Sequence, residues 1–354
     1  MAEDLPAGGG SSRALRIVVF GVTGQVGQEL VDRLDDGDWP IAELVGVASG
    51  DSHGESFEFR GDRLDVSAEW PVLKGTDLVF VCTRGAEALE IVRECLRASV
   101  PCVDLTGALA GQEEVPLPVV LGSAVDDGDP LNQAPLIAVP SSTTLAWAPV
   151  ITALSQAVEV TRVVATVLCS AAAHGRGGVA SLSEESIALF NQSAHPDPGP
   201  AGQAIAFDVV PGGGVDVERV RGELARVFGD ALRADLASVQ IPTFVGEGAS
   251  LAVELAGPLE RSVLEARLGA QDGLAVIAEG PGSRGLVAVE EGSPEPLGPT
   301  LRDAVGVDEV LVGRIEADAS AEPGQGWRLW LAYDPLRLAA DHAIRIARRR
   351  LGLG

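Results

Sequence analysis

Small hydroxyl residues follow Pro140, where an apolar run over 136–139 ends. Residues 140–144 read Pro-Ser-Ser-Thr-Thr, and Ser142 occupies a slot in which an acyl-transfer nucleophile could attack a carbonyl carbon. A serine hydroxyl is almost wholly protonated near neutral pH, so Ser142 would need a strong neighbouring base. Glu247 is the candidate base, and burial would have to raise the pKa of its carboxyl for it to act in this way.

A thiol and an imidazole form a second candidate pair. Cys169 ends a long β-branched run over 160–169, and His174 follows five residues later in the glycine-rich segment 170–178. If this segment folds back, His174 could be the base for Cys169 as a nucleophile; the alternative is an inert thiol in the core. The sequence holds no Cys-x-x-Cys pair, so it indicates neither a zinc site nor a disulfide framework.

Residues 14–34 predict a strand, a glycine turn and a helix in succession. The run over 14–20 is apolar and β-branched, 21–27 reads Gly-Val-Thr-Gly-Gln-Val-Gly, and 28–34 has helical spacing. Such a turn lets the backbone approach a pyrophosphate closely and leaves free amides at the helix N-terminus. The strand before it and the helix after it favour a dinucleotide site over a plain tight turn. The residues expected to contact the nucleotide are Gly21, Thr23, Gly24, Gln25, Val26 and Gly27.

Two later loops are expected to complete the nucleotide site. A second strand over 41–48 ends at Ser49-Gly-Asp51, where a doubly wound fold places the groups that read the adenosine ribose. An acid there favours a free 2′-hydroxyl, so Asp51 favours NAD over NADP, although it could equally be a solvated loop residue. Arg84 and Gly85 follow the next strand, and Arg84 could pair with a pyrophosphate or fill space that a cofactor once used. The sequence predicts NAD or NADP and leaves open a vestigial pocket without either.

Alternating strands and helices predict an α/β protein of two domains. The first is a doubly wound domain built on a βαβ series. Its further elements are expected at 78–82, 86–98, 102–105 and 136–139. The second domain mixes helices and strands, expected at 147–158, 160–169, 181–190, 218–232, 252–255, 310–315 and 327–333. The expected divisions are a disordered segment over 1–13, the dinucleotide-binding domain over 14–145, rejoined by a closing helix in 334–354, and the second domain over 146–333.

The same segments resemble the aspartate-semialdehyde dehydrogenase family. Its members read Pro-Asn-Cys-Ser/Thr-Thr where this chain reads Pro-Ser-Ser-Thr-Thr. Val-Gly-Arg-Ile at 312–315 and Asp-Pro-Leu-Arg at 334–337 also resemble family segments. The resemblance covers roughly residues 14–350. It implies a Rossmann-like N-terminal domain and a C-terminal domain of the α+β dehydrogenase type that forms dimers.

The resemblance also places the family's site residues on positions that differ here. Ser142 occupies the position of the catalytic cysteine, and Glu247 that of the acid/base histidine. Gln240 occupies the position of the arginine that clamps the substrate carboxylate. Cys169 occupies the position of the substrate-holding glutamine, and Ala110 that of the phosphate-binding arginine. The family's reaction forms a thiohemiacetal, loses hydride to the nicotinamide and transfers the acyl group to phosphate, and each step exploits sulfur. The resemblance therefore implies a scaffold, similar to family members without the cysteine, that has lost the parent activity.

Two enzyme alternatives remain open. An oxidoreductase acting on an aldehyde or acyl phosphate could use Cys169 with His174, and a hydrolase could use Ser142 with Glu247, although no Gly-x-Ser-x-Gly elbow is present. Within the expected helix over 218–232, Arg219 and Arg221 could supply a cation for an anionic substrate or form surface salt bridges.

The charge balance narrows the range of partners. The chain carries 26 basic and 51 acidic side chains, and its net charge of -25 repels nucleic-acid phosphates and anionic lipid. No uncharged apolar stretch approaches the roughly 20 residues of a membrane span, and the first residues lack the order of a signal peptide. We predict a cytoplasmic protein that binds neither nucleic acid nor membrane. The resemblance implies a homodimer built through an open sheet face, and it leaves open a mixed oligomer with a true dehydrogenase.

Overall fold

The computed structural model describes residues 14–52, 54–83, 85–121, 130–193, 199–277 and 298–353. The predicted disordered segment 1–13 and the candidate phosphate ligand Arg84 lie outside these ranges, as does the side chain of Asp51. No helix within the described ranges combines the length and the apolar character that crossing a membrane requires.

The N-terminal half forms a parallel sheet of five strands in the order β2-β1-β5-β6-β7. The strands are β1 (Leu15–Phe20), β2 (Ile41–Val47), β5 (Leu78–Val81), β6 (Cys102–Asp104) and β7 (Leu136–Ala138). Two of the helices that cover it are α1 (Gln25–Asp36) and α2 (Ala86–Ala98). Its strands are apolar runs because a parallel sheet is covered on both faces. The order reverses between β1 and β5, the topological switch point at which α/β sheets bind ligands. The predicted doubly wound α/β class is confirmed.

Short elements complete this half of the molecule. A 3-10 turn, η1 (Gly50–Ser52), follows β2 and leads into an antiparallel hairpin of β3 (Ser56–Phe59) and β4 (Asp62–Asp65). A second 3-10 turn, η2 (Pro130–Gln133), precedes β7.

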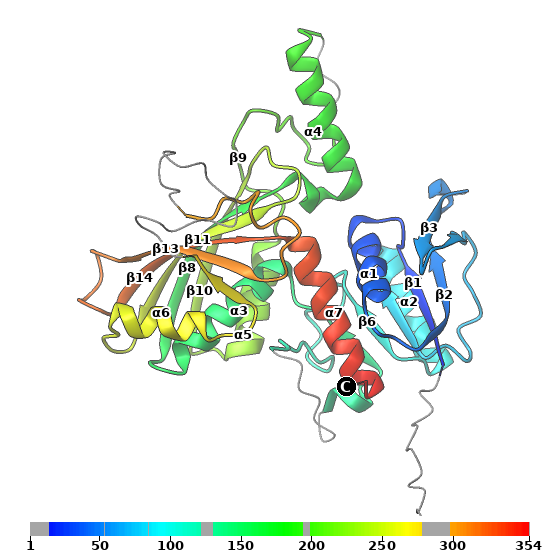
Figure 1. Cartoon of the computed structure of the whole chain (residues 1–354), viewed down its shortest axis with the longest axis horizontal. Helices are drawn as coiled ribbons and strands as arrows, with labels where there is room; N and C mark the ends of the chain where they lie inside the picture. Colours follow the sequence, from blue (N-terminus) through cyan, green and yellow to red (C-terminus); the bar gives the residue numbers. More distant parts are fainter. Residues whose placement is uncertain are drawn as a thin grey trace, which may run out of the picture.

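The C-terminal half forms a mixed sheet of seven strands in the order β12-β13-β14-β11-β8-β10-β9. The strands are β8 (Val160–Cys169), β9 (Val210–Pro211), β10 (Arg233–Gln240), β11 (Glu247–Leu255), β12 (Leu274–Val276), β13 (Val310–Ala317) and β14 (Gly326–Tyr333). Helices α3 (Ser142–Ser155), α5 (Val217–Phe228) and α6 (Arg261–Gly269) lie on one face of this sheet (Figure 1). Alternate residues of the strands are buried beneath these helices, which gives the half its own core.

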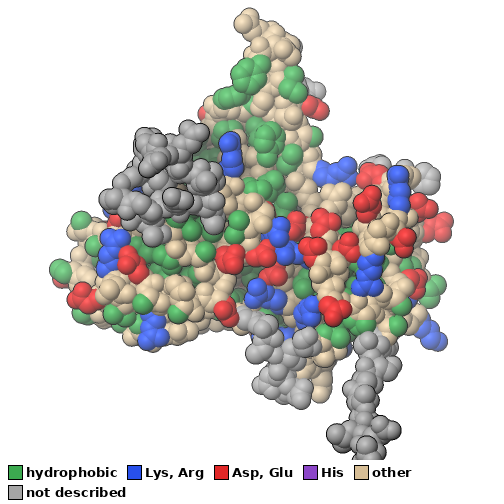
Figure 2. Space-filling view, in the orientation of Figure 1, with side chains coloured by type: hydrophobic (Ala, Val, Ile, Leu, Met, Phe, Trp, Pro, Cys, Tyr) green, Lys and Arg blue, Asp and Glu red, His purple; other side chains and the backbone are tan. Residues whose placement is uncertain are grey.

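The other side of the C-terminal sheet carries a projecting arm. Thr166 of β8 and Ser250 of β11 are exposed on the face that the three helices leave open. Helix α4 (Gly175–Phe190) follows the 3-10 turn η3 (Ala171–His174) and extends away from the sheet (Figure 1). Hydrophobic side chains line this projection (Figure 2), and the rings of Phe190 and Phe207 meet edge to face near its end. We call α4 with residues 199–209 the arm.

Helix α7 (Pro335–Leu351) closes the chain and lies between the two sheets (Figure 1). Asp334 caps it by accepting hydrogen bonds from the amides of Leu336 and Arg337. Its buried residues Ala343 and Ile346 belong to the same core as strand β1 and helix α1. The last segment of the chain therefore stabilises the first sheet.

Helices α3 and α4 begin well before the residues that the sequence pattern predicts. Helix α3 begins at Ser142 rather than at residue 147, because the hydroxyl of Ser141 accepts a hydrogen bond from the amide of Thr144 and caps it. Helix α4 begins at Gly175 rather than at residue 181. Its glycines have low helix propensity, but Gly178 packs so closely that a Cβ there would lie 2.3 Å from the carbonyl oxygen of Ala171. Tertiary packing overrides propensity at that point.

Candidate nucleotide site and interdomain pocket

The predicted glycine turn joins β1 to α1. Gly21 has a φ of +82°, and a Cβ on it would lie 2.7 Å from the amide nitrogen of Thr83. A Cβ on Gly27 would lie 2.2 Å from the carbonyl oxygen of Gly21. The turn therefore needs glycine both for its backbone angles and for the close contact of helix and strand.

The start of α1 fits a bound anion. Gly24 occupies the N-cap and supplies no side-chain hydrogen bond, so the first amides of the helix, at Gln25, Val26 and Gly27, have no capping side chain. The side-chain oxygen of Gln25 is buried and has no hydrogen-bond partner among the described residues. Thr23 lies beside the turn with its hydroxyl 3.0 Å from that of Ser52. These residues fit the pyrophosphate of a dinucleotide.

The other nucleotide candidates lie on the neighbouring loops. The carbonyl oxygen of Ser49 accepts a hydrogen bond from the amide of Ser52, and Asp51 lies in η1 between them. Gly85 is the N-cap of α2 and, like Gly21, has a positive φ. Both loops lie at the carboxyl ends of their strands, where the doubly wound fold holds a nucleotide.

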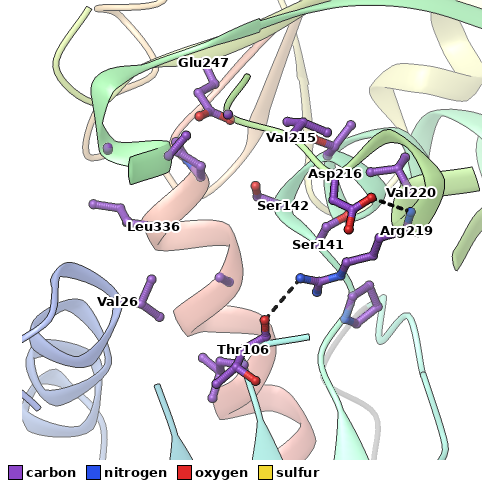
Figure 3. Close-up of a pocket in the computed structure, with 18 of the residues that line it drawn as sticks. Val26, Thr106, Ser141, Ser142, Val215, Asp216, Arg219, Val220, Glu247 and Leu336 are labelled. Atoms are coloured by element: carbon purple, nitrogen blue, oxygen red, sulfur yellow. Dashed lines mark hydrogen bonds between the residues drawn. The ribbon is translucent and has the colours of Figure 1, made fainter. Parts of the chain in front are cut away.

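A pocket of about 300 Å³ lies between the two halves of the molecule (Figure 3). Its walls come from the glycine turn, the segment after β6, the starts of α3, α5 and α7, and β11. The polar side chains around it are those of Thr106, Ser141, Ser142, Thr143, Asp216, Arg219 and Glu247. The structure thus brings together Ser142 and Glu247, which are far apart in the sequence.

Arg219 supplies the cation of this pocket. Its Nε lies 2.6 Å from Oε1 of Glu223, and its Nη1 donates to the carbonyl oxygen of Thr106 at 3.3 Å (Figure 3). Arg221 instead forms ion pairs with Glu218 and Asp235 on the exposed side of α5. Of the two arginines that the sequence left open, Arg219 is a pocket residue and Arg221 forms surface salt bridges.

Glu223 joins this arginine to the segment that carries Ser142. Its carboxylate is buried and accepts hydrogen bonds from the amide of Ser141 at 2.9 Å and from the hydroxyl of Thr144 at 2.6 Å. Glu223 is not among the site residues that the sequence motifs predict. A sequence signal existed, since Arg219 and Glu223 are spaced i,i+4 on a predicted helix.

Glu247 begins β11 and is buried with 2% of its surface exposed. Its carboxylate accepts hydrogen bonds from the amide of Ser170 at 3.3 Å and from the hydroxyl of Ser170 at 3.2 Å. Burial raises the pKa of Glu247 to about 7, although the two bonds from Ser170 oppose this shift. In the part of the chain that the structure describes, no hydrogen bond joins Glu247 to Ser142, so the predicted base is not engaged with the predicted nucleophile.

Gln240 and His174 form a separate polar contact next to a cavity of about 100 Å³. The side-chain amide of Gln240 donates to the carbonyl oxygen of Cys169 at 3.0 Å, and its oxygen lies 3.0 Å from Nε2 of His174. Gln240 therefore holds the loop after β8 in place.

Cys169 and His174 do not form the nucleophile and base pair that the sequence left open. The thiol of Cys169 is fully buried, its acceptor is the carbonyl oxygen of Val167 at 4.0 Å, and burial raises its pKa well above the ordinary range. The imidazole of His174 is paired with Gln240 instead. The pair fails to form because β8 ends with the Cys169 side chain turned into the core, packed against Gly214.

Ala110, which stands for the family's phosphate-binding arginine, is buried. Arg226 of α5 donates to its carbonyl oxygen and, at 2.6 Å, to that of Val115. This guanidinium is occupied by backbone groups, so it ties α5 to the first half of the molecule.

The fold defines an α/β protein that joins a doubly wound N-terminal half to a C-terminal half built on a mixed sheet. Residues 16–124 match the family model described as semialdehyde dehydrogenase, NAD binding domain. Residues 151–338 match the model described as semialdehyde dehydrogenase, dimerisation domain. The chain belongs to the semialdehyde dehydrogenase family.

Named proteins and a solved structure are similar to this chain over nearly its whole length. Aspartate-semialdehyde dehydrogenase of Legionella pneumophila is 28% identical, with 95% of each chain covered. A USG-1 protein homolog of Azotobacter vinelandii is also 28% identical, over 95% of this chain and 97% of that protein. The structure of a probable aspartate-semialdehyde dehydrogenase from Pseudomonas aeruginosa is 27% identical and matches with a TM-score of 0.79, covering 95% of this chain and 98% of that one.

Proposed function

We propose that this protein binds NAD or NADP and no longer catalyses the oxidation of a semialdehyde. The observation that carries the proposal is the pairing of Glu247 with Ser170, which leaves Ser142 without a hydrogen-bonded base among the described residues. A serine hydroxyl without such a base is a poor nucleophile near neutral pH. Ser142 would therefore bind or orient a ligand rather than attack it.

The cysteines near the pocket give no substitute thiolate. Cys82 contributes to the pocket wall, but burial, together with the charge of Asp104, raises the pKa of its thiol well above the ordinary range. Cys169 is fully buried in the core of the second half. Protonated thiols are weak nucleophiles, and an ester on Ser142 would be a poorer acyl donor than a thioester.

The uncapped start of α1 supports the nucleotide part of the proposal. When bound, a nicotinamide dinucleotide would supply a hydride acceptor or donor. The residues that would hold it are Gly21, Thr23, Gly24 and the first amides of α1, with Ser49, Asp51 and Gly85 on the adjoining loops. Arg84, which the sequence also proposes as a phosphate ligand, lies outside the described residues. The acidic side chain of Asp51 favours NAD over NADP, because it suits a ribose with a free 2′-hydroxyl.

We also propose that the protein forms a homodimer. The family's dimerisation domain supports self-association, and the arm exposes Phe190 by 76% and Phe207 by 68%. Exposed aromatic side chains of this size commonly mark an interaction surface. The open sheet face and the arm would together meet the second copy, and a mixed oligomer with an active dehydrogenase would use the same surface.

Calorimetric titration with NAD and NADP, followed by an aspartate-semialdehyde oxidation assay on the same sample, tests the proposal. We expect saturable binding, tighter for NAD, without turnover. Turnover by the wild-type protein would refute the loss of activity. Absence of binding to either dinucleotide would refute the nucleotide part.

A Ser142-dependent hydrolase is the second candidate. It is favoured by one observation: Glu247, with its pKa raised to about 7, lies in the same pocket as Ser142 and could act as a base after a local rearrangement. Turnover of a small ester by wild-type protein, abolished by Ser142→Ala, would support this function. Turnover that persists in Ser142→Ala would remove it.

A further inference from the structure

Arg176 reaches from the second half of the molecule to the glycine turn of the first. It is the second residue of α4, and its Nη1 lies 3.1 Å from the carbonyl oxygen of Thr23 and 3.1 Å from Oε2 of Glu55. The arginine and glutamate side chains are 54% and 40% exposed. The guanidinium is therefore accessible to a ligand, with one carboxylate as its counter-ion.

Arg176 lies beside the two segments that are proposed to bind the dinucleotide, the glycine turn and the loop after β2. Thr23 belongs to the turn whose following amides fit a pyrophosphate, and its hydroxyl meets that of Ser52 at the end of η1. Glu55 lies three residues after the end of η1, and its amide donates to the carbonyl oxygen of Ser52. The guanidinium thus lies where the turn and the ribose-reading loop converge, which is the path of a dinucleotide from its pyrophosphate to its adenosine ribose.

The base of α4 holds Arg176 in this position. The close packing of Gly178 against Ala171 fixes the first turn of the helix, and His174, its N-cap, is held by Gln240. These contacts belong to the second half of the molecule. A ligand that engaged Arg176 and the glycine turn together would connect the two halves.

We propose that Arg176 binds a phosphate of the dinucleotide and that Glu55 holds the guanidinium in its absence. The inference rests on the proposed binding of NAD or NADP. Glu55 accepts a hydrogen bond from Nη1 alone, whereas a phosphate could accept two parallel hydrogen bonds from the fork of guanidinium donors. The phosphate is either the pyrophosphate, common to NAD and NADP, or the 2′-phosphate that only NADP carries.

Titrations of the full-length protein with NAD and with NADP, by calorimetry, test this role in three variants. Arg176→Ala should weaken binding about tenfold, since it removes a charge-assisted hydrogen bond. Glu55→Gln should tighten binding about threefold, because it removes the competing carboxylate. Arg261→Ala is the matched control: Arg261 forms a helical ion pair with Glu265 whose side chains are similarly exposed, at 56% and 40%, away from the turn. It should leave both affinities unchanged.

The two substitutions should change the dinucleotide affinity in opposite directions, and this difference distinguishes ligand binding from a purely structural contact. If Arg176 and Glu55 only tie the two halves together, the two substitutions should change affinity in the same direction, and that result would overturn the inference. Equal losses for NAD and NADP in Arg176→Ala would assign the pyrophosphate, and a loss confined to NADP would assign the 2′-phosphate. Unchanged affinity in Arg176→Ala would refute the inference alone, whereas wild-type protein that binds neither dinucleotide would refute the proposed function with it.

Discussion

The carboxylate of Glu247 accepts two hydrogen bonds from Ser170, one from the backbone amide at 3.3 Å and one from the hydroxyl at 3.2 Å. Ser170 directly follows β8 and Glu247 begins β11, and these strands pair antiparallel with Leu168 opposite Gly248. Strand pairing therefore delivers the carboxyl to the amide. Glu247 therefore contacts the neighbouring strand end in the second sheet and also lines the pocket.

This burial makes stability depend on pH. The pKa of Glu247 is raised from 4.5 to about 7, so the folded protein holds this proton more tightly than the unfolded chain. Between these two values the unfolded state binds fewer protons, and the free energy of unfolding falls as pH rises, by about 3 kcal/mol in total. Above about pH 7 the contribution is constant. We expect Glu247→Gln to remove this fall, so that the stability advantage of the variant over wild type is small at pH 5 and reaches its full size by pH 8.

Urea unfolding at pH 5, 6, 7 and 8 measures this difference. Glu254→Gln is the control on the same strand, because Glu254 is half-exposed and paired with Arg162. Its effect should not vary across this range. A stability difference between Glu247→Gln and wild type that stays the same at all four pH values would contradict the assignment.

The ion pair of Arg219 and Glu223 should contribute far more to the free energy of unfolding than the ion pairs of Arg221 on the same helix. Arg219→Ala leaves the buried carboxylate of Glu223 without its cation, and we expect the free energy of unfolding to fall by about 3 kcal/mol. Arg221 forms only exposed pairs, so Arg221→Ala should match wild type within experimental error. Urea denaturation at pH 7.5 compares the two variants. Similar losses of unfolding free energy in both would show that the buried pair stabilises the protein no more than the exposed pairs do.

Gly27→Ala should damage the nucleotide turn. The new Cβ would lie 2.2 Å from the carbonyl oxygen of Gly21, a backbone atom that no side-chain rotation can move away. We expect a loss of about 2 kcal/mol in stability and no detectable heat on titration with NAD. Gly222→Ala in α5 is the control, since no heavy atom would lie within 4 Å of its Cβ, and it should stabilise the protein by roughly 0.5–1 kcal/mol. Retention of wild-type NAD affinity in Gly27→Ala would speak against this turn as the phosphate site.

The proposed dimer should depend on the aromatic residues of the arm. We expect the double substitution Phe190→Ser with Phe207→Ser to halve the molar mass in multi-angle light scattering, because it removes two exposed rings without touching either main core. Val72→Ser removes another exposed apolar side chain, 78% accessible, and should leave the mass unchanged. A double variant that remains dimeric would place the interface elsewhere, with the open sheet face as the next surface to test.

Local sequence patterns determined much of the fold. The β-branched runs predicted β1, β2 and β8 to within one residue of their observed ends, because a buried strand needs a continuous or alternating apolar pattern that is visible in the sequence alone. The glycine turn was equally readable, since Gly21 and Gly27 meet backbone constraints that only glycine satisfies. The positions of Ser142 and Glu247 followed from the family resemblance.

Only the tertiary structure decided which of these groups meet. Arg219 and Arg221 lie two residues apart and point to different sides of α5, and packing alone determines which side faces the pocket. His174 pairs with Gln240, 66 residues away, rather than with Cys169, and Arg176 reaches Thr23 across 153 residues. Such contacts depend on how strands and helices pack after they have formed, and no local spacing records that arrangement.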